Sequence, residues 1–265
     1  MRTSIKALLA STLLVSTLAA ASPALADETA PPSDFKITGS AAVVSQYRFR
    51  GISQSNNRPA VQGAITVAHS SGFYVSTWGS SASAGNSTVN IGGTEIDVYG
   101  GYTHGLGSSG VTIDAGLYGY IYPGAPGLNY YEIYGSLAKT VGPVNAKAGV
   151  FFAPKQTVLD ATPTHHSTYV YGELSGGIPG TPITLHSHLG HTGGGFNYTK
   201  QYIDYNVGAS LTWKNLTFDA SVVGTNVSKS DAAAAPFADQ TGTASPFETY
   251  RAAKAVGVFS VTASF

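Results

Sequence analysis

Four scarcities limit what this sequence of 265 residues encodes. It has no cysteine, which excludes the disulfide framework that many exported soluble domains use. Charged residues make up only 11% of the chain, and acidic and basic residues are equal in number, so no basic excess favours nucleic-acid binding. Beyond residue 26, no stretch approaches the roughly 18 consecutive apolar residues of a membrane-spanning helix. The single methionine fits a helix-poor chain.

The amino-terminal residues have the pattern of a secretory signal peptide. Arg2 and Lys6 form a short basic region, an apolar core of small residues follows, and Ala24-Leu25-Ala26 fits a cleavage site. A membrane anchor would need about 20 apolar residues, more than this core provides. We therefore predict a signal peptide at 1–26 and one exported domain at 27–265. Loss of Arg2 and Lys6 leaves a slight acidic excess, which again argues against nucleic acid.

The exported part alternates apolar and polar residues with a period of two, the pattern of half-buried β-strands. Ile203, Tyr205, Val207, Ala209 and Leu211 lie on one face of a run, and polar or small residues lie on the other. Glycine, tyrosine, valine, threonine and serine dominate the composition, as in β-proteins. Twelve such runs are predicted at 36–49, 58–68, 72–80, 93–103, 111–122, 129–141, 144–153, 167–178, 182–191, 201–213, 215–226 and 255–265.

The lengths of the runs and of their connections indicate the fold class. Most runs are longer than the ~5–6 residues of soluble strands and suit the ~9–11 residues of a tilted membrane-spanning strand. Short connections alternate with mostly longer loops, as in outer-membrane barrels with periplasmic turns. We predict an all-β fold, an antiparallel transmembrane β-barrel of twelve strands. A soluble β-sandwich or lectin-like domain is the alternative, since it also alternates.

In a membrane barrel the polar face of each strand points into the lumen. This parity places Tyr47 and Phe49 outward, in an aromatic girdle, and the neighbouring arginines inward, toward water or other charges of the lumen near the extracellular mouth. The charged and histidine side chains predicted to line a pore are Arg48, Arg50, Glu95, Asp97, Asp114, Glu132, Lys147, Glu173, His186, His188, Asp204 and Asp219. They could form separated patches that orient solutes, or salt bridges that brace a narrow lumen. Tyr99, Tyr118, Tyr120, Tyr130 and Tyr134 share the inward parity, as does Lys36.

Two patterns raise other chemistry. His186 and His188 share one strand face, a workable spacing for two metal ligands, but no third ligand is evident, and polar lining is the better interpretation. His69 with Ser71, and His165 with Ser167, have the spacing of a His and Ser pair in outer-membrane phospholipases, yet no supporting acid is evident by spacing. We therefore expect no enzyme, no metal and no cofactor.

The long connection at 227–254 contains a short helix signal. Ser230 precedes Asp231 and a run of alanines that stops at Pro236. We predict a helix there, in a loop that folds over or into the extracellular mouth.

The stretch YRFRGISQSNNRPAVQG at 47–63, followed by GFYVSTWGS at 72–80, resembles the hallmark segment of the TorF family of porins from Gram-negative bacteria. EIDVYGGY at 95–102 and NYYE at 129–132 are also similar. The resemblance implies a barrel in the cell outer membrane. Phe265 resembles the terminal aromatic that barrel-assembly machinery recognises.

The predicted function is passive diffusion of small hydrophilic solutes or ions through a polar lumen. A closed structural or adhesive barrel is the alternative, and an outer-membrane hydrolase is a weaker one. The expected partners are outer-membrane lipid, the solutes and the assembly machinery; a homo-oligomer is compatible with the sequence.

Overall fold

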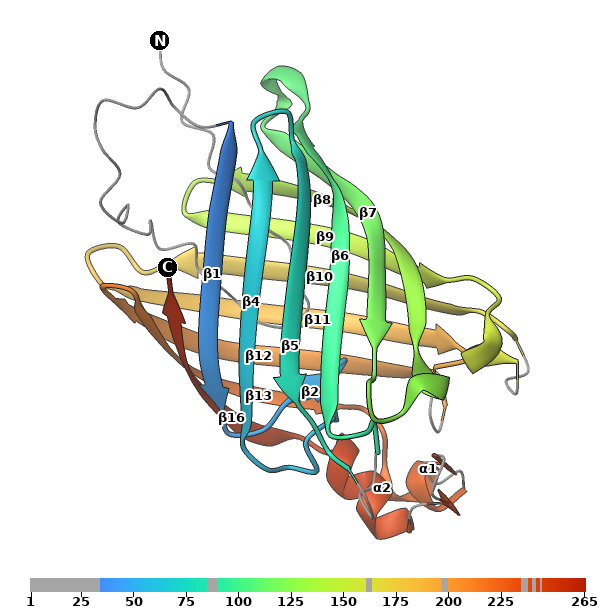
Figure 1. Cartoon of the computed structure of the whole chain (residues 1–265). Helices are drawn as coiled ribbons and strands as arrows, with labels where there is room; N and C mark the ends of the chain where they lie inside the picture. The colour runs from blue at the N-terminus through green and yellow to red at the C-terminus, as the bar shows by residue number, and fades with distance from the viewer. Residues whose placement is uncertain are drawn as a thin grey trace.

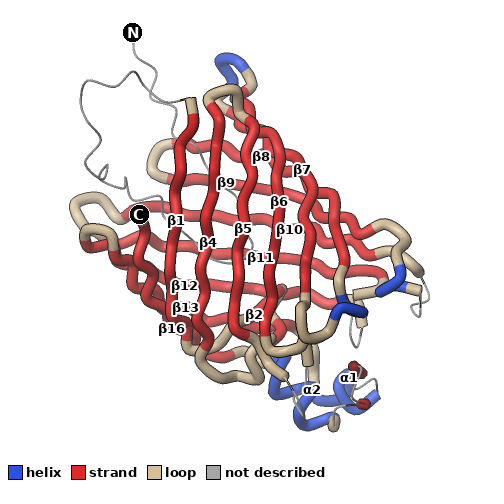
Figure 2. The backbone as a smooth tube through the Cα atoms, in the orientation of Figure 1, coloured by secondary structure: helices blue, strands red, loops and turns tan. Residues whose placement is uncertain are grey.

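Twelve long strands form one closed antiparallel barrel (Figures 1 and 2). The computed structural model describes residues 34–84, 90–160, 164–196, 200–234, 238–239, 242–243 and 245–265. The predicted signal peptide, residues 1–26, lies outside these ranges. The barrel strands are β1 (Phe35–Val44), β4 (Ala60–His69), β5 (Phe73–Ser81), β6 (Thr94–Gly105), β7 (Val111–Ile121), β8 (Tyr130–Val141), β9 (Val144–Ala153), β10 (Ser167–Gly177), β11 (Ile183–Gly194), β12 (Tyr202–Trp213), β13 (Leu216–Thr225) and β16 (Val256–Ser264).

The predicted fold class and strand number are confirmed, because each predicted run overlaps one barrel strand. Neighbouring strands in the sequence pair along the sheet, and β1 closes the barrel by pairing with β16. At this seam Gly39 and Phe265 exchange two backbone hydrogen bonds of 2.8 and 3.0 Å. A Cβ at Gly39 would lie 2.5 Å from the Phe265 ring, so the terminal aromatic packs where glycine leaves space.

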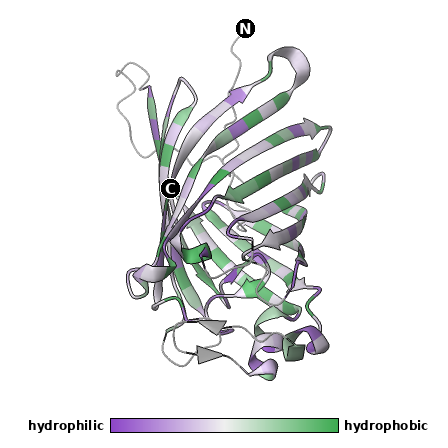
Figure 3. Ribbon diagram, turned by 90° about the vertical axis from the view of Figure 1, so that its right-hand side faces the viewer, coloured by the Kyte–Doolittle hydropathy of each residue, from purple (hydrophilic) through white to green (hydrophobic). Residues whose placement is uncertain are grey.

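The outer surface of the barrel is apolar and its inner surface is polar. On β12, Ile203, Val207 and Leu211 are exposed, whereas Asp204 and Ser210 are buried. Figure 3 shows hydrophobic and hydrophilic residues alternating along the strands. A soluble barrel or sandwich places its apolar residues inside; this one presents them to the surroundings, which suits contact with lipid chains.

A charge on this outer surface should destabilise the barrel in a bilayer. Val207, in the middle of β12, is 59% exposed. We expect Val207→Arg to lower the free energy of unfolding in lipid vesicles by about 2–4 kcal/mol, because arginine there would face hydrocarbon. Trp213→Arg, at the end of the same strand, should cost only about 0–1 kcal/mol. Urea titrations of both variants in vesicles test this; equal losses would mean that Val207 does not face the bilayer core.

The connections alternate in length, as predicted. Short turns at 70–72, 106–110, 142–143, 178–182 and 214–215 lie at the end of the barrel where β1 begins. The longer connections lie at the opposite end, together with α1 (Lys229–Ala234) and α2 (Pro246–Ala253), below the barrel in Figure 1. We call these the turn end and the loop end. Short 3-10 helices are η1 (Gly107–Ser109), η2 (Pro126–Leu128) and η3 (Thr157–Leu159), and β14 (Ala238–Asp239) pairs with β15 (Gly242–Thr243).

The first predicted run is wrong at its far end. It was expected to continue to residue 49, but β1 ends at Val44, and the chain then makes a small separate hairpin of β2 (Arg48–Phe49) and β3 (Ile52–Ser53). Arg50 and Gly51 form its two-residue turn with φ of 46° and 78°, the positive values that such a tight hairpin requires. A Cβ at Gly51 would lie 2.6 Å from Thr225 and 2.9 Å from Asp204, so the turn packs against the inner wall.

The predicted helix in the long connection is present as α1, with Ser228 rather than Ser230 at its start. The Asp231 backbone N–H donates to the Ser228 hydroxyl, and the Ser228 N–H donates to the Asp231 carboxylate, a reciprocal cap. The second helix, α2, was missed, although Ser245, Pro246 and Glu248 are a recognisable helix start. Among the described residues, neither helix nor any other has the length and apolarity to cross a membrane.

The ion pair of Lys200 with Asp231 should persist in acid. Lys200 Nζ lies 2.6 Å from the carboxylate; this contact and the Ser228 donors lower the pKa of Asp231 to about 2. Because the folded pKa is depressed, the stabilisation is present above pH ~4 and is lost as the pH falls through the folded pKa. An NMR titration of the Asp231 carboxyl should give a midpoint about 2, and Lys200→Gln should raise it. A midpoint near pH ~4 in the unmodified protein would contradict the ion pair.

Candidate functional site: the barrel interior

All twelve predicted pore-lining residues lie on the inner side of the barrel, but not all in the way expected. Ten of them are buried, and only Glu173 and Asp219 retain partly exposed side chains of 32% and 19%. Ten belong to wall strands, whereas Arg48 and Arg50 belong to the β2–β3 hairpin. Both arginines were expected to face water or other charges of the lumen; they are 6% and 3% exposed, so they do not face water, but Arg50 does face a charged group, Glu132.

Arg50 is the central contact of the hairpin with the wall. Its Nη2 donates to the Glu132 carboxylate at 2.6 Å, and the Tyr120 hydroxyl donates to the same oxygen at 2.9 Å. The guanidinium carbon lies 4.2 Å from the Tyr169 ring centre and 4.7 Å from that of Phe49. The Nη1 atom of Arg50 has no hydrogen-bond partner among the described residues. The cation–π contacts with the two rings therefore contribute to stabilising the buried guanidinium.

Arg48 supports the hairpin through neutral oxygens. Its guanidinium donates to the Gly51 and Lys254 carbonyls at 2.7 and 3.1 Å, to Asn57 Oδ1 at 3.1 Å and to Gln46 Oε1 at 3.0 Å. The Lys254 carbonyl directly follows α2. Arg48 therefore joins the hairpin to the helical segment that closes the loop end.

The aromatic residues around the arginines face inward too, which overturns the predicted girdle of Tyr47 and Phe49. Tyr47 is buried, its hydroxyl donates to Glu95 at 2.9 Å, and its ring lies 5.3 Å from Trp78. Phe49 packs edge-on against Tyr120 at 5.6 Å. The chain leaves the barrel wall after Val44. Beyond this residue, side chains no longer point alternately to lipid and lumen, so the parity assigned to Tyr47 and Phe49 does not apply.

A second inner cluster surrounds the two histidines. His188 lies between Glu173 and Asp204, with nitrogen–oxygen distances of 3.2 and 3.3 Å, and also contacts the Tyr169 hydroxyl at 2.6 Å. His186 lies 2.6 Å from Asp219. Each histidine thus has its own carboxylate partners. Among the described ranges, no group of three or more His, Cys, Asp or Glu side chains is arranged to hold a metal ion.

The remaining predicted residues line the middle of the barrel. Asp114 accepts a hydrogen bond of 2.8 Å from Tyr74, which also contacts the Tyr134 hydroxyl. Lys147 Nζ lies 5.5 Å from the Tyr171 ring centre. Sequence reasoning missed Tyr169, Tyr171 and Phe151 as inner residues, although Tyr169 and Tyr171 share the parity of Glu173 on β10, and Phe151 that of Lys147 on β9.

The two His and Ser pairs lie at opposite ends of the barrel. His69 and Ser71 are in contact at 2.7 Å, but both lie exposed at the turn end, where Ser70 rather than His69 contacts Asp34. His165 has a left-handed backbone in a loop, while the Ser167 hydroxyl donates to the Gly193 carbonyl. In the described structure neither histidine is oriented by a carboxylate.

The interior narrows from the turn end toward the loop end. Inward residues near the turn end, such as Thr38, Thr103, Asn145 and Ser175, are partly exposed, which indicates access for solvent. Toward the loop end the hairpin fills the barrel, and Ile52, Tyr120, Glu132 and Tyr202 are almost fully buried. The described structure therefore has a vestibule at one end and a plug at the other. We call residues 46–57 the plug segment.

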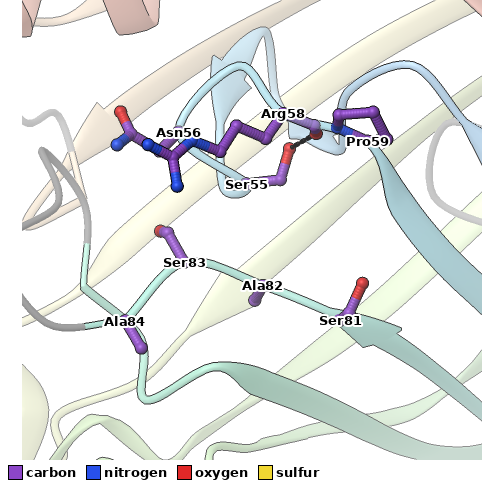
Figure 4. Close-up of a pocket in the computed structure, with 8 residues that line it drawn as sticks. All are labelled: Ser55, Asn56, Arg58, Pro59, Ser81, Ala82, Ser83 and Ala84. Carbon is purple, nitrogen blue, oxygen red and sulfur yellow. Dashed lines mark hydrogen bonds between the residues drawn. The ribbon is translucent and has the colours of Figure 1, made fainter.

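A cavity of about 480 Å³ lies beside the plug segment at the loop end (Figure 4). It is lined by Ser55, Asn56, Arg58, Pro59, Ser81, Ala82, Ser83 and Ala84. The Ser55 hydroxyl donates to the Arg58 carbonyl at 2.6 Å, which holds the turn before β4, and Arg58 itself is exposed. Of the three arginines in the stretch at 47–63, Arg58 is thus the one that faces water.

Solved structures with a similar fold are outer-membrane barrels. The KdgM porin is 13% identical with a TM-score of 0.55, over 86% of this chain and 99% of that one. The NanC porin is 10% identical with a TM-score of 0.52, over 87% and 99%. The COG4313 outer membrane channel from Pseudomonas putida F1 is 11% identical with a TM-score of 0.50, over 92% and 99%. At these identities the likeness concerns the fold.

Sequence comparisons give the family. A search of curated proteins finds no significant match. The family described as "Bacterial protein of unknown function (Gcw_chp)" matches residues 28–265. Since the match spans nearly the whole chain, this protein belongs to the Gcw_chp family.

Proposed function

We propose that this protein is a porin of the TorF type in the outer membrane, through which small hydrophilic solutes or ions diffuse passively. The observation that carries the proposal is the closed twelve-stranded barrel with an apolar outer surface and a charged inner one. Such a surface needs lipid around it, and such an interior holds water or polar solutes. The fold shared with the KdgM and NanC porins supports it.

Export and assembly follow from the same proposal. The signal peptide at 1–26 directs the chain across the inner membrane and is removed. Phe265, exposed on the outer surface at the β1–β16 seam, is available to the barrel-assembly machinery. Short turns in outer-membrane barrels are periplasmic, so the turn end faces the periplasm and the plug and helices face outward.

The twelve interior residues are proposed to line the conduction path. Because the plug segment occupies the loop end, only small solutes are expected to pass between it and the wall. The inner wall carries more carboxylates than the hairpin arginines and Lys147 neutralise, so cations should be favoured over anions. The ion pair of Glu132 with Arg50 holds the plug against the wall. This is the role that the alternative prediction gave to salt bridges, which would brace a narrow lumen.

The test is single-channel recording of the refolded mature protein in a planar bilayer, with a salt gradient. Discrete conductance steps with a cation-selective reversal potential are expected. A correctly folded barrel that gives no steps would refute the porin proposal and favour a closed structural or adhesive barrel. A reversal potential of the opposite sign would refute the cation preference alone.

A further inference from the structure

Two carboxylates on β6 are buried together inside the barrel. Glu95 and Asp97 are two residues apart on one strand, point inward, and are 1% and 2% exposed. As second neighbours on one face of β6, their side chains leave the strand about 7 Å apart and can approach each other. Two like charges at this separation in a dry interior repel strongly.

Their direct hydrogen-bond donors are tyrosine hydroxyls. Tyr47 and Tyr122 donate to the two Glu95 oxygens at 2.9 and 3.3 Å, and Tyr118 donates to Asp97 Oδ2 at 2.8 Å. Asp97 Oδ1 has no hydrogen-bond partner among the described residues. A free, buried carboxylate oxygen beside a second carboxyl group is a costly arrangement without a further partner.

No cationic side chain of the described structure compensates this pair. Arg50 donates to Glu132, and Arg48 donates to neutral oxygens. In the described ranges, none of the ion pairs includes either residue. Glu132, opposite Tyr118 in the β7–β8 register, adds further negative potential. One shared proton would still leave a net negative charge, so the pair requires either a second proton or a bound cation.

We propose that Glu95 and Asp97, with the Tyr118 hydroxyl oxygen, bind a hard metal cation inside the barrel. Oxygen atoms, above all those of carboxylates, are the ligands that such cations prefer, and Asp97 Oδ1 is one without a hydrogen-bond partner among the described residues. The role of this site in permeation rests on the proposed porin function. It deepens that function, because a cation bound beside the plug makes the passage selective for cations. Two carboxylates without a third bind weakly enough to release an ion in transit.

Terbium luminescence tests the site without requiring conduction. Tb³⁺ replaces hard cations at oxygen sites and emits when a nearby tyrosine absorbs light. Folded wild-type barrel in detergent should give sensitised emission that Ca²⁺ displaces and that is lost on unfolding. The double variant Glu95→Gln with Asp97→Asn removes both carboxylate ligands and should lower the Tb³⁺ affinity by more than the roughly 10–100-fold that is typical when only a group supporting a ligand is lost. The double variant, and the control variant described next, must first show the heat-dependent gel mobility of a folded barrel.

Asp114→Asn is the matched control. It removes another inner carboxylate that accepts a hydrogen bond from a tyrosine hydroxyl. Asp97 is paired with Tyr120 on β7, and Asp114 lies six residues from Tyr120 on that strand, about 20 Å away. It should retain the wild-type Tb³⁺ affinity. Equal affinity of the wild type and the double variant would overturn the site. The site would also be overturned if no emission is seen and the infrared spectrum shows a protonated-carboxyl band that disappears in Asp97→Asn. In that case protons, and not a metal cation, neutralise the pair.

Bilayer recordings separate this proposal from the porin proposal. In the double variant the cation preference of the reversal potential should fall. Tb³⁺ binding in a barrel that never conducts would support the site and refute the porin. Conduction with an unchanged reversal potential and no Tb³⁺ binding would refute the site and leave the porin standing.

Discussion

Replacing residues 45–59 by an Asn-Gly turn should raise the single-channel conductance severalfold. The segment leaves the wall after β1 and returns at β4, and between these points it forms the hairpin that fills the loop end. Val44 and Ala60 are paired directly in the β1–β4 register, so a two-residue turn of a type suited to hairpins can join them. The wall strands are left intact, while the obstruction is removed.

The same operation at the turn end is the control for the plug deletion. Gly105 and Thr112 are paired in the β6–β7 register, so residues 106–111 can also be replaced by Asn-Gly. This variant shortens a connection of the barrel but removes nothing from the interior, and its conductance should equal that of the wild type. If both variants fold and the plug deletion leaves conductance unchanged, the hairpin does not limit the path.

The second large effect is expected from Glu132→Ala. The substitution leaves Arg50 buried without its carboxylate, and breaking one partner of a buried ion pair typically costs about 3–5 kcal/mol. The guanidinium is held beside Tyr169 and Phe49 in a space that water does not reach. We expect the hairpin to be released from the wall at a lower urea concentration than the one that unfolds the barrel.

Trp78 provides the measurement for this release. Its ring lies 5.3 Å from Tyr47, just before β2, and the other tryptophan, Trp213, lies outward. In a Trp213→Phe background, Trp78 fluorescence should change early in urea for Glu132→Ala, whereas the β-sheet circular dichroism should change later. Coincident transitions in both signals would contradict a separately held plug.

A double variant shows whether the ion pair itself is responsible. Adding Arg50→Met to Glu132→Ala removes the uncompensated charge and keeps an apolar chain among the aromatic rings, so much of the lost stability should return. If Glu132→Ala and the double variant are equally unstable, the cost arises from packing around Glu132 instead. The Tyr120 hydroxyl, which also donates to Glu132, loses this acceptor in both variants and so does not contribute to the difference between them.

The wall of the barrel was predictable because its determinants are local. A strand that separates lipid from a polar interior must alternate at every second residue, so the twelve strands and the inward parity of Glu95, Asp97 or His188 could be read from the sequence. The alternation of turn and loop lengths likewise gave the barrel and its two ends. Helix α1 was found from its local start and stop residues.

The plug could not be predicted in this way. Ala41, Val43, Tyr47 and Phe49 share one parity that only Ser45 interrupts, and the two aromatic residues suit a lipid-facing girdle as well as a packed interior. What takes the chain inward is a set of long-range contacts, such as that of Arg50 with Glu132, which lie 82 residues apart. The sequence by itself thus determined a twelve-stranded barrel with a charged interior, because the two-residue period is local. Only the tertiary structure decided that its arginines are buried in a plug, because their partners meet them only when the barrel closes.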